Sequence, residues 1–212
     1  SGGGVWRICV PLTGIGTFMS TDNVLSMADR TTLLEVARAS IQHGLRHRRA
    51  LTVNPDDYPE TLRLLRATFV TLEIGGQLRG CIGALTAYQP LVRDVAAHAY
   101  AAAFEDPRFP ELRPDEFPKL EIFISVLSPP EPMRFGSEED LLAQVRPGVD
   151  GLILQFRHHR ATFLPSVWES LPDPYVFLAQ LKHKAGLPLD FWSPELRVER
   201  YTTEYFGAGD AG

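Results

Sequence analysis

The residues with the clearest potential for chemistry form one short segment, Leu78 to Gly83, which reads Leu-Arg-Gly-Cys-Ile-Gly. In an extended strand, side chains alternate between faces, so Arg79 and Cys81 are expected on one face. Their Cα atoms would lie roughly 6.6 Å apart, where a guanidinium can stabilise a thiolate and create a nucleophile. Gly80 and Gly83 would let a ligand approach the backbone, although strand glycines also mark bulges. A more frequent interpretation is a cysteine that packs as a small hydrophobe.

A cysteine nucleophile normally needs a base, and His98 is the candidate because it lies on the apolar helix that follows the segment. Its simpler interpretation is a core histidine that is satisfied by a backbone group. Glu121 lies among apolar residues of a predicted strand. Facing inward, it needs a raised pKa or a partner such as Arg79 or Arg108, and an outward-facing glutamate is equally consistent with the pattern.

Metal and cofactor sites find little support in the sequence. His43 and His47 have the spacing that places two side chains on one helical face. However, Gly44 predicts that the helix ends between them, and no third ligand is near. No Walker loop, GxGxxG, HExxH, GxSxG or CxxC motif occurs. We therefore predict no metal site and no cofactor.

Composition and charge exclude several classes of protein. The 212 residues carry 21 basic and 26 acidic side chains, a net charge of −5, so no global positive field favours nucleic acid. Nucleic-acid binding through the basic run Arg46 to Arg49 is the weakest functional hypothesis, since no aromatic residue interleaves with it. No apolar stretch is long enough to span a bilayer. Two cysteines, Cys9 and Cys81, cannot form a disulfide framework, which favours a cytoplasmic protein.

Hydrophobic periodicity predicts regular elements along most of the chain. In the first half of the chain we expect a helix from a cap at Asp29 to a stop at Gly44, then strands at 69–73 and 78–85 joined by a Gly75-Gly76 turn, and then a buried helix at 91–104 after Pro90. A strand at 120–127 and a helix from Ser137 to about Val145 follow. The last expected elements are a second hairpin at 151–156 and 161–164 and a helix from Asp173 to Gly186.

The repeated order of hairpin and helix suggests an internal duplication within one α+β domain. We expect this domain to cover residues 25–207, with two lobes that would meet near 130–150. Residues 1–24, which begin with Ser-Gly-Gly-Gly, are expected to hold a cloning remnant and a segment outside the domain. Residues 208–212 are expected to form a flexible tail.

Several segments together resemble the AMMECR-one domain family, over about residues 29–206. The most specific is Arg-Gly-Cys-Ile-Gly at 79–83. The others are Phe-Val-Thr-Leu at 69–72, Ala-Ala-Ala-Phe-Glu-Asp-Pro-Arg-Phe at 101–109, Ser-Val-Leu-Ser at 125–128, Asp-Gly-Leu at 150–152, Phe-Leu-Pro at 163–165 with Trp168, and Lys-Ala-Gly-Leu-Pro at 184–188.

The resemblance implies a compact α+β fold with two β/α repeats on a single, largely antiparallel, barrel-like sheet with helices packed outside. It also implies partners, because similar prokaryotic proteins are protein A of the AmmeMemoRadiSam system, which occurs with a Memo-like protein and a radical-SAM protein. Family members often carry a cysteine just before the Lys-Ala-Gly-Leu segment, where this chain has Leu181-Lys182-His183. A mechanism that needs two thiols is therefore not expected.

Two hypotheses of function follow, and the sequence leaves open whether the protein is an enzyme. The first is an accessory or binding module that holds a small molecule or a partner segment in a cleft. Its expected binding residues are Gly80, Ile82, Gly83, Asp106, Arg108 and Glu121. The second is an enzyme in which Cys81 attacks an electrophile, with Arg79 stabilising the thiolate and His98 moving protons.

Overall fold

The computed structural model describes residues 25–210. This part of the chain divides into two compact units. Among the described residues, unit 1 consists of 25–127 and 204–210, and unit 2 is the intervening segment Ser128–Thr203. Each unit has its own sheet and its own hydrophobic core, so each is described by itself.

The sheet of unit 1 is built from four strands, in the spatial order β2-β1-β3-β8. They are β1 (Thr68–Ile74), β2 (Gln77–Gly83), β3 (Leu120–Leu127) and β8 (Thr203–Gly207). Strand β1 pairs antiparallel with both β2 and β3. The β1–β2 hairpin turns through Gly75 and Gly76, whose φ angles of +57° and +72° suit glycine. Strand β2, which carries the Arg-Gly-Cys-Ile-Gly segment, is therefore at the sheet edge.

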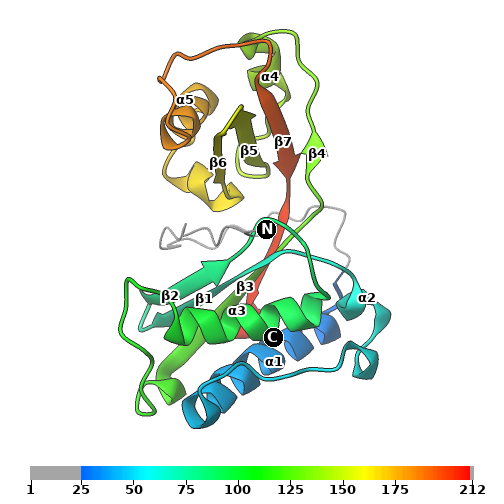
Figure 1. Ribbon diagram of the computed structural model, residues 1–212, viewed down its shortest axis with the longest axis vertical. Coiled ribbons are helices and arrows are strands. Elements are labelled where there is room, and N and C mark those ends of the chain that lie inside the picture. The colour runs from blue at the N-terminus through cyan, green and yellow to red at the C-terminus, as the bar shows by residue number, and fades with distance from the viewer. Residues whose placement is uncertain (1–24, 211–212) are drawn as a thin grey trace. The chain divides into compact units, whose positions relative to one another are not determined.

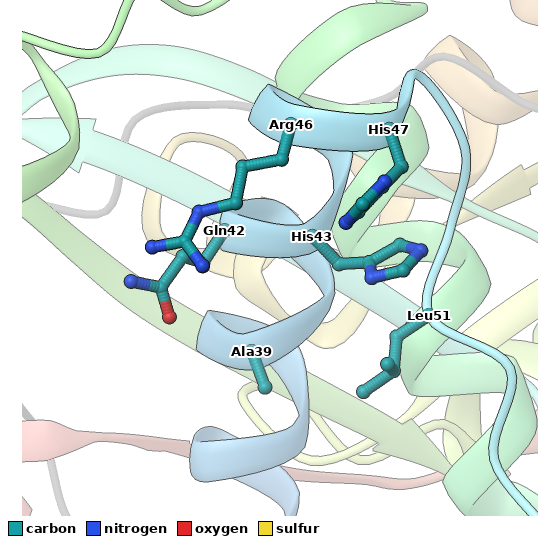
Figure 2. Close-up of a pocket in the computed structure, with 6 residues that line it drawn as sticks. All are labelled: Ala39, Gln42, His43, Arg46, His47 and Leu51. Carbon is teal, nitrogen blue, oxygen red and sulfur yellow. The ribbon is translucent and has the colours of Figure 1, made fainter.

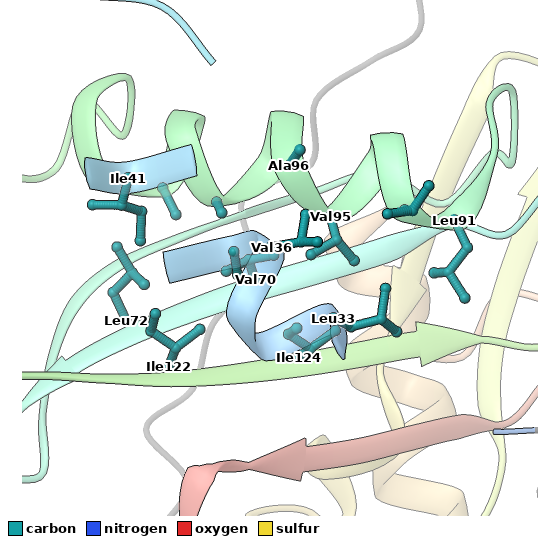
Figure 3. Close-up of a cluster of buried hydrophobic side chains, with 14 of the residues drawn as sticks. Leu33, Val36, Ile41, Val70, Leu72, Leu91, Val95, Ala96, Ile122 and Ile124 are labelled. Carbon is teal, nitrogen blue, oxygen red and sulfur yellow. The ribbon is translucent and has the colours of Figure 1, made fainter. Parts of the chain in front are cut away.

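Two helices, α1 (Met27–His47) and α3 (Leu91–Phe104), cover one face of this sheet, and the short helix α2 (Glu60–Arg63) precedes β1 (Figure 1). Figure 3 shows the core between them, where Leu33 and Ile41 of α1 and Val95 of α3 meet Val70 of β1 and Ile124 of β3. All five side chains are essentially inaccessible to water. Burial of this apolar surface is the main force that holds the helices on the sheet.

Helix α1 differs from its prediction at both ends. Its N-cap is Ser26, and Asp29 is the third helical residue, whose carboxylate completes a capping box. The helix continues through Gly44 and ends at His47, with Arg48 in the left-handed conformation as its C-cap. Gly44 is a contact residue here, because a Cβ at this position would clash with Tyr100 and Phe104 of α3. The predicted stop at Gly44 is therefore wrong.

Unit 2 contains a second four-stranded sheet, in the order β4-β7-β5-β6, with antiparallel pairs throughout. Its strands are β4 (Glu131–Pro132), β5 (Gly151–Phe156), β6 (His159–Phe163) and β7 (Arg197–Tyr201), and its helices are α4 (Glu138–Gln144) and α5 (Pro174–Lys184). Trp168 stacks on Phe177 of α5 with ring centroids 3.7 Å apart. These two side chains lie in the core of this unit.

The α+β class and the repeated order of hairpin and helix are confirmed: β1, β2 and α3 in unit 1 correspond to β5, β6 and α5 in unit 2. The single barrel-like sheet is replaced by two separate open sheets among the described residues. The hairpin β5–β6 pairs with β7, whereas β1 pairs with β3, so no described pairing joins the two sheets. No helix in the part of the chain described here has the length and hydropathy needed to cross a membrane. The expectations for residues 1–24 and 211–212 lie outside the described residues.

Candidate functional site

Arg79 is positioned by an irregularity in β2 beside Gly80, one of the two glycines for which a bulge was an alternative interpretation. Leu72 lies opposite Gly80 and Glu73 lies opposite Leu78, so Arg79 is the additional residue of a β-bulge. Its guanidinium donates two hydrogen bonds of 3.0 Å, from Nε and Nη2, to the two carboxylate oxygens of Glu116. This bidentate pairing lowers the pKa of Glu116. The charge of Arg79 is thus matched by a carboxylate.

The backbone of Cys81 is held by a side-chain ion pair from the loop after α3. The N–H of Cys81 donates to Oδ2 of Asp106 at 2.9 Å, and its carbonyl accepts from Nη2 of Arg108 at 3.3 Å. Asp106 and Arg108 also bind each other, with Nη2 and Oδ2 2.7 Å apart. Because β2 is an edge strand, its outward-facing groups at Cys81 would otherwise lack a ladder partner. The Asp106–Arg108 pair therefore closes the edge at this residue.

Asp106 is a strongly stabilised carboxylate. Its side chain is 1% exposed, and burial alone would raise the pKa of its carboxyl group. The guanidinium of Arg108 and the backbone N–H groups of Cys81 and Arg108 outweigh burial, so the pKa is lowered. The carboxylate is thus ionised at neutral pH and has the charge that this arrangement needs.

The sulfur of Cys81 and the imidazole of His98 lie on opposite faces of the sheet. Cys81 is buried, and its Sγ is 3.2 Å from the Thr71 hydroxyl. Thr71 alternates with Val70 and Leu72, whose side chains enter the core under α1 and α3. His98 lies on α3, which covers this same face of the sheet. The structure therefore does not bring together the cysteine and the base that the enzyme hypothesis requires.

His98 has an orienting group that the sequence analysis could not place. Its Nδ1 lies 3.1 Å from Oδ2 of Asp94 and 3.0 Å from the hydroxyl of Thr68, and that hydroxyl donates to Asp94 at 2.6 Å. Gln89 donates a further hydrogen bond to the other oxygen of Asp94. Three of these residues, Thr68, Asp94 and His98, are buried. The cluster ties the start of α3 to β1. His98 is thus a buried histidine with partners, but these are the side chains of Thr68 and Asp94 and not the backbone group that was expected.

Gly80, Ile82 and Gly83 fill the interior of unit 1. A Cβ at Gly80 would collide with the carbonyl oxygen of Ala102 in α3, and one at Gly83 would collide with the ring of Phe69. Ile82 belongs to the hydrophobic core. These three positions allow close packing of β2 against its neighbours.

Glu121 lies apart from the arginines that were considered as its partners. It is exposed on β3, directly opposite Glu73 of β1. Burial of Glu73, together with the charge of Glu121, raises the pKa of the Glu73 carboxyl group. Arg79 pairs with Glu116 and Arg108 pairs with Asp106. The outward-facing alternative for Glu121 is the one that the structure adopts.

Phe109 joins the candidate site, and the sequence indicated it only as the last residue of the segment at 101–109. The guanidinium carbons of Arg79 and Arg108 lie 6.0 Å and 5.5 Å from the centre of its ring. Both distances are within the range of a cation–π contact. Arg108 keeps 32% of its side chain exposed, and Phe109 is partly exposed. We call Arg108, Phe109 and the buried Arg79, which contacts the same ring, the two-arginine surface; the available signal was the aromatic residue directly after Arg108.

Comparisons with known proteins agree on one family. The AMMECR1 family model matches residues 34–206. A protein from Methanothermobacter thermautotrophicus is 41% identical over 188 residues, which cover 86% of this chain and 95% of that protein. A protein from Thermococcus gammatolerans is 39% identical, with coverage of 82% and 87%. The crystal structure of an uncharacterised protein from Pyrococcus horikoshii matches with a TM-score of 0.74 and 34% identity, covering 83% of this chain and 89% of that chain.

Proposed function

The chain belongs to the AMMECR1 family, and from this premise we propose that it is a cytoplasmic binding module that acts with a Memo-like protein and a radical-SAM protein. The contact is made by the two-arginine surface, Arg79, Arg108 and Phe109. This surface lies beside the Arg-Gly-Cys-Ile-Gly segment, since Arg108 binds the backbone of Cys81. The proposal requires no reactive group on this chain.

The observation that carries the proposal is the pairing of two guanidinium groups around one aromatic ring. Arginine and aromatic side chains are the residues that most often dominate the energy of protein interfaces. Arg108 is partly exposed although it is held by Asp106. Because the ion pair fixes its position, little side-chain entropy remains to be lost on binding.

The chemistry of this surface favours an anionic group on the partner. The guanidinium of Arg108 is the one that a partner can reach, because 32% of its side chain is exposed, whereas Arg79 is buried. Guanidinium groups bind carboxylates in a bidentate manner. The ligand is therefore expected to carry a carboxylate, either on an aspartate or glutamate of a partner segment or on a small molecule.

The test is a binding titration of the full chain with a Memo-like and a radical-SAM protein from the same organism, by isothermal calorimetry. Arg108→Lys keeps a positive charge but loses the planar, bidentate group. We expect this variant to weaken binding by about tenfold or more, which corresponds to about 1.4 kcal/mol.

The matched control is Arg113→Lys, because Arg113 lies on the same loop, is highly exposed and pairs with the neighbouring Asp115. It should bind as the unchanged chain does. If neither candidate protein binds the unchanged chain, or if the Arg108 and Arg113 variants bind equally well, the proposal is wrong.

A further inference from the structure

A hollow of about 160 Å³ lies on α1, away from the Arg-Gly-Cys-Ile-Gly segment. Its lining comes from the C-terminal half of the helix and from the segment that follows: Ala39, Gln42, His43, Arg46, His47 and Leu51. Figure 2 shows the two imidazoles on one side of α1, facing the segment that carries Leu51. The side chain of Arg46 extends beside Gln42 on the other side. Two nitrogen ligands therefore lie together at this hollow.

The two histidines are neighbours because α1 continues beyond Gly44. At positions i and i+4, their side chains project from the same face of the helix. The ring centroids are 4.3 Å apart. Two imidazole nitrogens that bind one zinc-sized ion at about 2.1 Å lie at most about 4.2 Å from each other. Because both rings project from one helical face, rotation of the exposed His47 side chain is the movement that would bring a nitrogen of each ring to one ion.

The helix end that carries His47 is firmly anchored. Arg48, the C-cap, donates its N–H to the carbonyl of Gly44, and its own carbonyl accepts from the hydroxyl of Tyr100 on α3. The guanidinium of Arg48 is paired with both carboxylate oxygens of Glu111. The charge of Arg48 is thereby balanced, whereas the guanidinium of Arg46 belongs to the lining of the hollow. The C-terminal end of a helix also carries partial negative charge, which favours a cation.

We propose that His43 and His47 chelate one divalent transition-metal ion at this hollow, with water completing its coordination. Imidazole pairs suit Cu²⁺, Ni²⁺ and Zn²⁺, and the general order of affinities places Cu²⁺ first. Among residues 25–210, no group of three or more His, Cys, Asp or Glu side chains is arranged to hold a metal ion. The ion therefore keeps open positions for exchangeable ligands.

The test is a titration of the full chain with Cu²⁺, followed by electron paramagnetic resonance. The unchanged chain should bind one ion with splitting from two imidazole nitrogens. His47→Asn, at an exposed position, should lose that signature and bind at least about tenfold more weakly. His43→Asn should behave in the same way. The control His183→Asn changes an exposed histidine of α5 and should bind like the unchanged chain.

Thermal unfolding gives an independent readout. An ion that binds only the folded chain raises the unfolding temperature, so saturating Ni²⁺ should raise it for the unchanged chain and for His183→Asn. It should raise it less for His47→Asn. The proposal is overturned if the nitrogen signature persists in His47→Asn, if it is absent from the unchanged chain, or if Ni²⁺ shifts all variants equally.

Discussion

At the residue scale, Asp106 contributes more to holding the candidate site together than Cys81 does. One carboxylate accepts from the backbone of Cys81, from the backbone of Arg108 and from the guanidinium of Arg108. It is almost completely buried. If this buried carboxylate is removed, all three donors lose their hydrogen-bond acceptor at once, and no other group replaces it.

Asp106→Asn should therefore lower the free energy of unfolding by about 3 kcal/mol at pH 7, the usual effect of breaking a buried ion pair. Because the folded state lowers the pKa of Asp106, its contribution is full above the unfolded value of about 3.9 and is lost as the pH falls through the lower, folded value. Urea unfolding between pH 7 and pH 2.5 measures both effects. The difference between the two chains should shrink at the acidic end.

Asp115→Asn is the appropriate control, since Asp115 is an exposed partner of Arg113 on the same loop. Surface ion pairs contribute little to stability. A loss for Asp115→Asn as large as that for Asp106→Asn, or a difference for Asp106 that does not depend on pH, would contradict the role assigned to Asp106.

At the element scale, the edge strand β2 approaches α3 through Gly80. We expect Gly80→Ala to lower the free energy of unfolding by about 2–3 kcal/mol, because the added methyl group meets the backbone carbonyl of Ala102, which cannot move without the helix. Thermal and chemical unfolding would measure this loss. Gly136→Ala is the matched control, since nothing lies within 4 Å of a Cβ at that position. Equal stability of the two variants would show that β2 and α3 are less closely packed.

The sequence predicts elements well where local signals and tertiary packing agree. The hairpin at Gly75-Gly76 is an example, since apolar strands flank a turn that needs positive φ. At Gly44 the same kind of signal gives a wrong helix end. Glycine is needed there because the helix packs closely against Tyr100 and Phe104, which belong to a helix distant in sequence. Strands β7 and β8 were not predicted, since segments such as Arg-Val-Glu-Arg-Tyr carry too many charges to suggest a strand.

The candidate site was predictable only in part for a similar reason. Alternation placed Arg79 and Cys81 on one face, but Arg79 is the additional residue of the bulge beside Leu72, where strict alternation does not hold. The opposite placement of Cys81 and His98 depends on which face of β1 the helices cover, and spacing along the chain does not encode it. Asp106 and Arg108 were expected only as binding residues, a role that stays a prediction, and the sequence did not pair them with each other. Their contact with the Cys81 backbone becomes visible only in the fold.

At the scale of the whole molecule, the chain is one unit interrupted by another. The core of unit 1 draws on residues before Leu127 and on Phe206, which follows the return from unit 2 and is 1% exposed. The buried residues of the unit 2 core lie within 141–198, and Met133 and Phe135 pack against them. Each core is thus complete in its own unit, as expected for parts that fold separately.

This organisation predicts that unit 2 can be removed if β8 is kept. The N–H of Ser128 donates to the carbonyl of Thr202, and the N–H of Thr202 donates to the hydroxyl of Ser128, both at 2.8 Å. The ends of the excised segment are therefore adjacent, and an Asn-Gly turn can replace residues 129–201. We expect this shortened chain to unfold in one cooperative transition, measured by urea and circular dichroism. A chain that simply ends at Leu127 lacks Phe206 and should be about 3–5 kcal/mol less stable than the bridged chain. Equal stability of the two shortened chains would mean that β8 and Phe206 add nothing to the core of unit 1. A bridged chain without cooperative unfolding would mean that unit 1 depends on unit 2 for its fold.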